Sequence, residues 1–122
     1  MSKAKVLIAD DEPFNVEVLE QALDETDYQI ITAANGQEAW EKIQSEQPDL
    51  ILLDLMMPIM DGFAVLAKVK EDAMLRDIPI IIVSAEQDSK SVVKGIKQGA
   101  EDYLTKPINT AQFVHKVKEY LG

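Results

Sequence analysis

Five short apolar runs alternate along the chain with five longer amphipathic segments, and this alternation limits the possible folds severely. The runs have the length and composition of β-strands, and they cover residues 5–9, 28–33, 50–53, 80–83 and 100–105. Strands that alternate with helices need crossover connections, which produce a mainly parallel sheet with helices on both faces. The sequence therefore predicts an α/β fold with five strands and five helices. The alternation by itself leaves the strand order open.

The segments between and after these runs carry apolar residues at helical spacing. In chain order the sets are Val16, Leu19 and Leu23; Ala39, Trp40 and Ile43; Phe63, Leu66 and Val69; Val92, Val93 and Ile96; and Phe113, Val114, Val117 and Leu121. Pro13 suits the first turn of the first helix, with Asp11 or Glu12 as its cap, and Asn109 is expected to cap the last.

The runs differ in polarity, and this predicts their places in the sheet. Residues 50–53 and 80–83 are continuously apolar, which is typical of strands covered on both faces. Residues 100–105 are more polar and suit a sheet edge.

Length and composition exclude several classes of protein. The 122 residues contain no repeat or linker, so we expect one domain over residues 1–122. Without cysteine, the chain has no disulfide, thiolate metal site or cysteine nucleophile, and with a single histidine a zinc or copper site is disfavoured. Neither a membrane-length apolar run nor a signal peptide is present, which makes a cytoplasmic protein without membrane contact the expectation.

The net charge of −10 disfavours direct nucleic-acid binding, because a phosphate backbone would repel the chain. The charge is uneven, since residues 90–122 hold six lysines and only three acidic residues. This imbalance fits either ordinary solvated helix faces or a surface that meets a partner.

Chemically active side chains stand where four of the five predicted strands end. They are Asp10 and Asp11, Asp54, Ser84 and Lys106. Ligands of an open parallel sheet bind beyond the carboxyl ends of its strands, so these groups should share one edge. Positive charge from Mg²⁺ or from a lysine relieves the electrostatic repulsion between clustered carboxylates. Carboxylates that share an edge with a hydroxyl and an amine suit phosphoryl transfer. Each residue alone could be only a turn or cap residue; together they favour a site.

These residues carry a resemblance to a known family. Asp10-Asp11, Asp54 with the loop of residues 56–62, Ser84-Ala85 and Lys106-Pro107 match the receiver domain of two-component response regulators over essentially the whole chain. The resemblance implies a flavodoxin-like, doubly wound sheet of strand order 2-1-3-4-5.

The resemblance also implies roles for the residues that meet at the site. Asp54 resembles the phosphoacceptor, and Lys106 the lysine that pairs with a phosphoryl oxygen, with a cis bond to Pro107. Asp11, Asp54 and the backbone carbonyl of Met56 resemble the direct Mg²⁺ ligands, and Asp10 a ligand through water.

Ser84 and Tyr103 resemble the switch pair of the family, in which a ring turns inward when the hydroxyl moves toward the phosphoryl group. The implied output surface is the fourth helix, fifth strand and fifth helix. The implied partners are a histidine kinase or histidine phosphotransfer protein and a downstream effector, and homodimerisation through the output surface stays open. Met56 and Glu86 are expected to flank the site and influence phosphate loss.

Two other functions remain as alternatives. One is a phosphorylation-independent pseudo-receiver, against which the complete acidic set argues. The other is an aspartate-nucleophile phosphohydrolase; such enzymes usually place a second acid two residues after the nucleophile, where this chain has Met56. We therefore expect a signalling switch that assists only its own phosphorylation and dephosphorylation.

Overall fold

The computed structural model describes residues 3–85 and 89–122, which form five strands and five helices in strict alternation. The strands are β1 Lys5–Ala9, β2 Gln29–Ala33, β3 Leu50–Asp54, β4 Ile80–Ala85 and β5 Asp102–Lys106. The helices are α1 Pro13–Ala22, α2 Gly36–Glu46, α3 Gly62–Glu71, α4 Ser89–Lys97 and α5 Thr110–Leu121. The predicted class is confirmed; the limits of β1 agree with the prediction, and those of the other strands differ from it by at most two residues.

All neighbouring strands are parallel, in the order β2-β1-β3-β4-β5. This is the order that the family resemblance implied. Every residue of β3 is buried, as the continuous apolar run predicted, whereas β5 is a partly exposed edge strand. The order places β3 at the centre of the sheet, so the end of β3 is surrounded by the ends of its neighbours.

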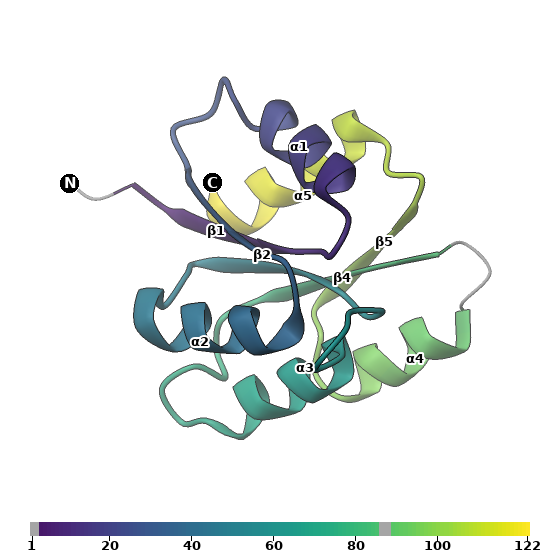
Figure 1. Cartoon of the computed structure of the whole chain (residues 1–122). Coiled ribbons are helices and arrows are strands. Elements are labelled where there is room, and N and C mark those ends of the chain that lie inside the picture. The colour runs from purple at the N-terminus through teal and green to yellow at the C-terminus, as the bar shows by residue number, and fades with distance from the viewer. Residues whose placement is uncertain (1–2, 86–88) are drawn as a thin grey trace.

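Helices cover both faces of the sheet, with α1 and α5 on one face and α2, α3 and α4 on the other (Figure 1). Successive side chains of each strand point to opposite faces of the sheet. Val6 and Ile8 of β1 pack with α1 and α5, whereas Leu7 and Ala9 pack with α2 and α3. Phe113 and Val117 of α5 are fully buried, as their helical spacing predicted.

Polar side chains cap three of the helices. Asn109 accepts a hydrogen bond from the Gln112 N–H at 3.0 Å, which confirms the predicted cap of α5. Asn35 and Asp61 cap α2 and α3 in the same way, and neither cap was predicted. Glu12 holds the cap position of α1, but its side chain makes no capping hydrogen bond.

The apolar set of α4 is only partly buried. Val92 is buried, whereas Val93 and Ile96 leave 52% and 39% of their surface exposed. Gly95 is the other buried residue of the helix, and a Cβ there would stand 2.1 Å from Ile82 Cδ1. Helix α4 thus meets the sheet through Val92 and Gly95, and its remaining apolar residues lie beyond that contact.

No helix in the described parts of the chain is long and apolar enough to cross a membrane.

Candidate functional site

The carboxyl ends of four strands bring the predicted site residues to one edge of the sheet. Asp10 follows β1 directly, Asp54 ends β3, Ser84 lies next to the end of β4 and Lys106 ends β5. Asp10, Asp54 and Ser84 are only 3%, 4% and 2% exposed. They are the buried polar residues of the described chain, and all of them belong to this site.

Lys106 joins the two buried carboxylates. Its Nζ lies 2.9 Å from Asp54 Oδ2 and 3.3 Å from Asp10 Oδ2. The lysine therefore reaches from the edge strand β5 across β4 to groups on β3 and β1. The Lys106–Pro107 peptide bond is cis, as the resemblance implied.

Each buried carboxylate divides its two oxygens between the main chain and Lys106. Asp54 Oδ1 accepts a hydrogen bond from the Met56 N–H at 3.0 Å, and Asp10 Oδ1 accepts one from the Glu12 N–H at 2.9 Å. In both residues the Oδ2 atom faces the ammonium group. The backbone thus holds both carboxylates in a fixed orientation.

Burial and charge shift the pKa values at this site in known directions. Burial raises the pKa of Asp54 above its ordinary value, while the Met56 hydrogen bond and Lys106 partly oppose the rise. Burial alone would lower the pKa of Lys106, but the hydrogen bond and charge of Asp54, together with Asp10, outweigh it and raise that pKa. Lys106 therefore stays a cation between two carboxylates.

An acidic cluster adjoins this arrangement. Asp10, Asp11 and Glu12 can each offer a carboxylate oxygen within 4.8 Å of the others. Asp11 and Glu12 are exposed, so water can complete the shell of a bound ion. Hard oxygen donors at this separation fit Mg²⁺, which keeps several waters when it binds to proteins. The sequence suggests Glu12 only as a possible helix cap, because the direction of its carboxylate depends on the conformation of the turn after β1.

The loop between β3 and α3 forms the rim of the site. Gly36 and Gly62 let this loop pass close to α2 and to β3, since a Cβ at Gly36 would stand 1.7 Å from Met60 O. The side chain of Met56 is 72% exposed, next to the site. Glu86, the other residue expected to flank it, lies outside the described residues.

The two expected switch residues differ in environment. The Ser84 side chain is buried, and its hydroxyl donates a long hydrogen bond of 3.5 Å to the Ala85 carbonyl, which is a weak contact. Tyr103 is 45% exposed and lies on β5, opposite Ile82 in the strand register. The structure therefore has the ring in an outward position.

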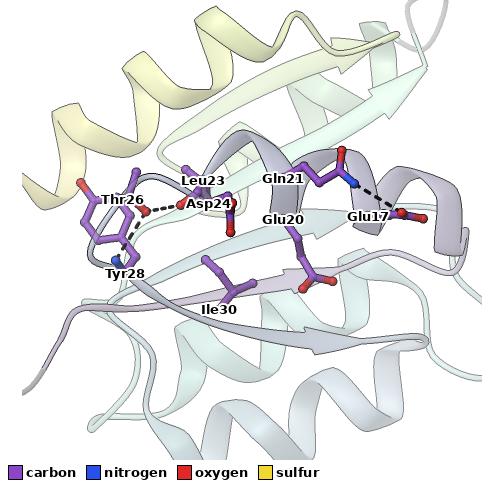
Figure 2. A pocket seen from close by; sticks show the side chains of 8 residues that line it. All are labelled: Glu17, Glu20, Gln21, Leu23, Asp24, Thr26, Tyr28 and Ile30. Carbon is purple, nitrogen blue, oxygen red and sulfur yellow. Dashed lines mark hydrogen bonds between the residues drawn. The ribbon is translucent and has the colours of Figure 1, made fainter.

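A separate hollow of about 330 Å³ lies between α1 and the start of β2, away from these residues (Figure 2). Glu17, Glu20 and Asp24 line it together with Tyr28 and Ile30. None of the predicted site residues contributes to it. Its acidic lining alone does not define a binding site.

The parallel sheet, with helices on both faces and an acidic edge, places the protein in the class of doubly wound α/β proteins (Figure 1). Comparison with known proteins then identifies the family. A solved structure that is similar over nearly its whole length is the signal receiver domain of a signal transduction histidine kinase from Syntrophus aciditrophicus. It has a TM-score of 0.88 and 37% identity, and the match covers 97% of this chain and 89% of that one. The family model described as response regulator receiver domain matches residues 6–118. The chain belongs to this family.

Two curated relatives place the domain in longer proteins. The response regulator PleD of Caulobacter vibrioides is 39% identical over 115 residues, which are 94% of this chain and 25% of PleD. The alkaline phosphatase synthesis transcriptional regulatory protein PhoP of Bacillus subtilis is 37% identical over 117 residues, 96% of this chain and 48% of PhoP. The chain thus spans about a quarter to a half of these relatives. Receiver domains are signalling modules of two-component systems, and they generally bind Mg²⁺ in an acidic pocket.

Proposed function

We propose that this chain is a phosphorylation-dependent switch that accepts a phosphoryl group on Asp54. The observation that carries the proposal is the environment of this carboxylate. One oxygen is held by the Met56 N–H at 3.0 Å and the other by Lys106 at 2.9 Å, in a setting that is 4% exposed. A carboxylate fixed in this way is positioned as a nucleophile toward a group that enters at the sheet edge.

The phosphoryl donor is a histidine kinase or a histidine phosphotransfer protein. An Asp54 oxygen forms the new bond to phosphorus, and the bond between phosphorus and the donor imidazole nitrogen breaks, with its electron pair returning to the nitrogen. Lys106 neutralises charge on the phosphoryl oxygens, because its ammonium group already lies beside Asp54. Ser84 supplies a hydroxyl that hydrogen-bonds one of these oxygens.

Asp10, Asp11, Asp54 and the backbone carbonyl of Met56 are the residues that we propose for Mg²⁺, with Asp10 acting through water. Asp10 and Asp11 belong to the acidic cluster, and Glu12 adds a third carboxylate, which is exposed. Bound Mg²⁺ supplies positive charge that offsets these acids and the incoming phosphoryl group.

Phosphorylation places new negative charge and acceptor oxygens at Asp54. The Ser84 hydroxyl makes only a long contact to Ala85, so little holds it from moving toward them. Tyr103 then turns inward, and the surface formed by α4, β5 and α5 changes shape. This surface meets the downstream effector, and homodimerisation through it is a second use of the same face.

Residues 1–122 act, in this proposal, as one receiver domain in the cytoplasm. Its chemistry is limited to its own phosphorylation and dephosphorylation, so the domain is not a turnover enzyme on a metabolite. An aspartate-nucleophile phosphohydrolase would need a general acid near Asp54. The residue two positions further on is Met56, whose side chain cannot take that role.

The test is intact-mass measurement after incubation with acetyl phosphate and Mg²⁺. We expect one labile phosphoryl group on the wild type, and none on Asp54→Ala or after treatment with a chelator. Asp77→Ala, which removes an exposed acid elsewhere, is the matched control and should gain the group. No gain from acetyl phosphate or from a phosphorylated histidine phosphotransfer protein would contradict the proposal and favour a phosphorylation-independent interaction module.

A further inference from the structure

Strand β2 forms one edge of the sheet, on the side opposite to β5. The Gln29 N–H donates to the Ala4 carbonyl at 2.8 Å, so Gln29 turns its main-chain groups toward β1 and the segment before it. Because successive residues of a strand turn these groups in opposite directions, those of Ile30 and Thr32 face the open edge. An open strand edge can pair with an added segment of another chain.

The sequence of β2 lacks the features that protect an edge strand from such pairing. Its five residues include no charged side chain and no proline. The other edge strand, β5, contains Asp102 and Lys106, and Asp102 is paired with Lys116 of α5. An added strand therefore meets less resistance at β2 than at β5.

One side chain from outside β2 already bonds to this edge. Lys42 Nζ of α2 donates a hydrogen bond to the Thr32 carbonyl, and it also lies 3.2 Å from Glu38 Oε1. A main-chain carbonyl and a carboxylate together thus hold an ammonium group at the edge. This contact shows which chemistry the edge accepts from a side chain, namely a cation.

Two adjacent hollows run along β2 on the side of α1. The hollow in Figure 2 measures about 330 Å³ and reaches Tyr28 and Ile30, and a second of about 290 Å³ reaches Thr32. Glu17 and Glu20 of α1 line both, so the two hollows form one groove. The side chains of Ile30 and Thr32 are only partly buried beneath it. A strand added beside β2 would turn alternate side chains toward this groove.

The groove is acidic and its charges are uncompensated. Glu17, Glu20 and Asp24 are exposed, and none of the salt bridges within the described residues includes them. Glu17 accepts only a long hydrogen bond of 3.4 Å from the neutral Gln21 side chain. Residues 6–41 contain ten acidic residues and no lysine, arginine or histidine. The charge of the groove therefore complements a basic partner.

We infer that a basic, extended segment of a partner protein pairs with the edge of β2 as a sixth strand. Its main-chain groups bond to those of Ile30 and Thr32. Its lysine or arginine side chains lie against Glu17 and Glu20. An N–H of the segment takes the Thr32 carbonyl from Lys42, whose ammonium group keeps its carboxylate partner.

Other occupants fit this edge less well. Two copies of the chain that paired through β2 would bring their acidic grooves close to each other, which like charges oppose. A nucleic acid is repelled by the same carboxylates. This surface goes beyond the proposed function, since it lies at the opposite edge of the sheet from β5 and its occupation does not require phosphorylation.

The experiment selects binders from a phage-displayed library of random peptides of about 10 residues, which reach about 33 Å when extended and so exceed the length of β2. The complete chain is the target, in buffer that contains Mg²⁺. Selected peptides are synthesised with a fluorophore in three forms, namely unmodified, N-methylated at odd positions and N-methylated at even positions. Anisotropy measures their binding to the wild type, to Glu20→Lys and to the control Glu71→Lys, which changes an exposed acid of α3.

We expect the selected peptides to combine Lys and Arg with β-branched residues. Glu20→Lys should weaken binding about tenfold, with a loss that shrinks at high salt. Glu71→Lys makes the same change in net charge and should weaken binding less than about threefold. Circular dichroism of each variant verifies that it is folded.

Two further readouts are specific to strand pairing. One of the two N-methylated forms should bind at least about tenfold more weakly than the unmodified peptide, because it lacks the N–H donors that reach β2. The other form should bind nearly as well, since its remaining N–H groups face the partner strand. Amide hydrogen exchange at Ile30 and Thr32 should slow in the complex, because their N–H groups leave water.

The inference would be overturned by an absence of binders, by binders that are neutral or acidic, or by equal loss in Glu20→Lys and Glu71→Lys. Equal binding of all three peptide forms, or unchanged exchange at Ile30 and Thr32, would show electrostatic attraction without strand pairing and would also overturn it. A wild-type dimer in which these two amides exchange slowly without peptide would assign the edge to a second copy of the chain instead.

Discussion

Lys106 and Asp54 are 52 residues apart in the sequence, yet Lys106 Nζ donates a hydrogen bond to Asp54 Oδ2 at 2.9 Å. The same ammonium group lies 3.3 Å from Asp10 Oδ2, so one cation offsets two buried carboxylates. This arrangement explains how both acids are tolerated at less than 5% exposure. It also makes the site sensitive to the loss of one lysine.

Lys106→Met should destabilise the chain by about 2–3 kcal/mol in buffer that contains a chelator. The substitution leaves Asp10 and Asp54 buried without their cation, and the partial exposure of the lysine keeps the loss below that of a fully buried pair. Added Mg²⁺ should restore more stability to this variant than to the wild type. Urea unfolding with and without Mg²⁺ measures both effects.

Lys118→Met, which removes an exposed lysine of α5, is the control and should remain within about 0.5 kcal/mol of the wild type. If Lys106→Met proved equally harmless, Lys106 would not be the cation that stabilises the two acids.

Asp54→Asn should reveal how much the buried carboxylate lowers the free energy of unfolding of the wild type at each pH. The folded-state pKa of Asp54 is raised by burial, so the folded chain binds this proton more tightly than the unfolded chain, whose carboxyl keeps a pKa near 3.8. The stability of the wild type therefore falls as pH rises from 3.8 through the raised value and stays lower above it. The stability of Asp54→Asn relative to wild type should increase over this window and then level off.

Urea unfolding of both proteins at a series of pH values, in buffer with a chelator, measures this difference. Asp77→Asn is the comparison for an exposed acid. A difference between Asp54→Asn and wild type that is independent of pH would show that Asp54 titrates normally.

Gly36→Ala should destabilise the chain by more than about 2 kcal/mol, because a Cβ at this position would stand 1.7 Å from the Met60 carbonyl oxygen. A backbone atom of the loop beside the site would have to move. Gly95→Ala is the matched change in another helix, where the atom that the Cβ would approach most closely is the terminal Cδ1 of the Ile82 side chain and the gain in helix propensity offsets part of the cost. Thermal unfolding should rank Gly36→Ala well below Gly95→Ala, and the reverse order would contradict the packing described for this loop.

Ile59→Asn should stabilise the chain by about 1 kcal/mol. Ile59 has a φ of 71°, and the Met60 N–H donates to the Pro58 carbonyl at 2.7 Å, which is a γ-turn. A β-branched residue is strained in this left-handed region, which asparagine enters more easily. Met74→Asn is a control at a similarly exposed apolar position, since Ile59 and Met74 are 80% and 79% exposed. An equal rise in melting temperature for both variants would assign the effect to surface polarity instead of backbone strain.

Much of the candidate site could be predicted from sequence because parallel strands all end at the same edge. Asp10, Asp54, Ser84 and Lys106 each follow or end an apolar run, so locating the strands was enough to bring them together. The family resemblance implied the strand order 2-1-3-4-5, which is confirmed, whereas the alternation of strands and helices alone does not determine it.

Other features depend on distances between side chains, which the pattern of the sequence does not contain. Glu12 joins the acidic cluster because of where the turn after β1 places its carboxylate. Val93 and Ile96 share the helical spacing of buried residues, yet they are exposed because α4 contacts the sheet through Val92 and Gly95. Asp61, an acid in the loop after Asp54, proved to be the cap of α3.

The sequence by itself determined the elements and the face that each strand residue serves, because those depend on local periodicity and on the burial of apolar side chains. Only the tertiary structure decided that Lys106 reaches Asp54 and Asp10 together and that an acidic groove beside α1 borders the open edge of β2. These relationships depend on strand order, helix placement and side-chain conformation. Each is settled by packing between segments that are distant along the chain.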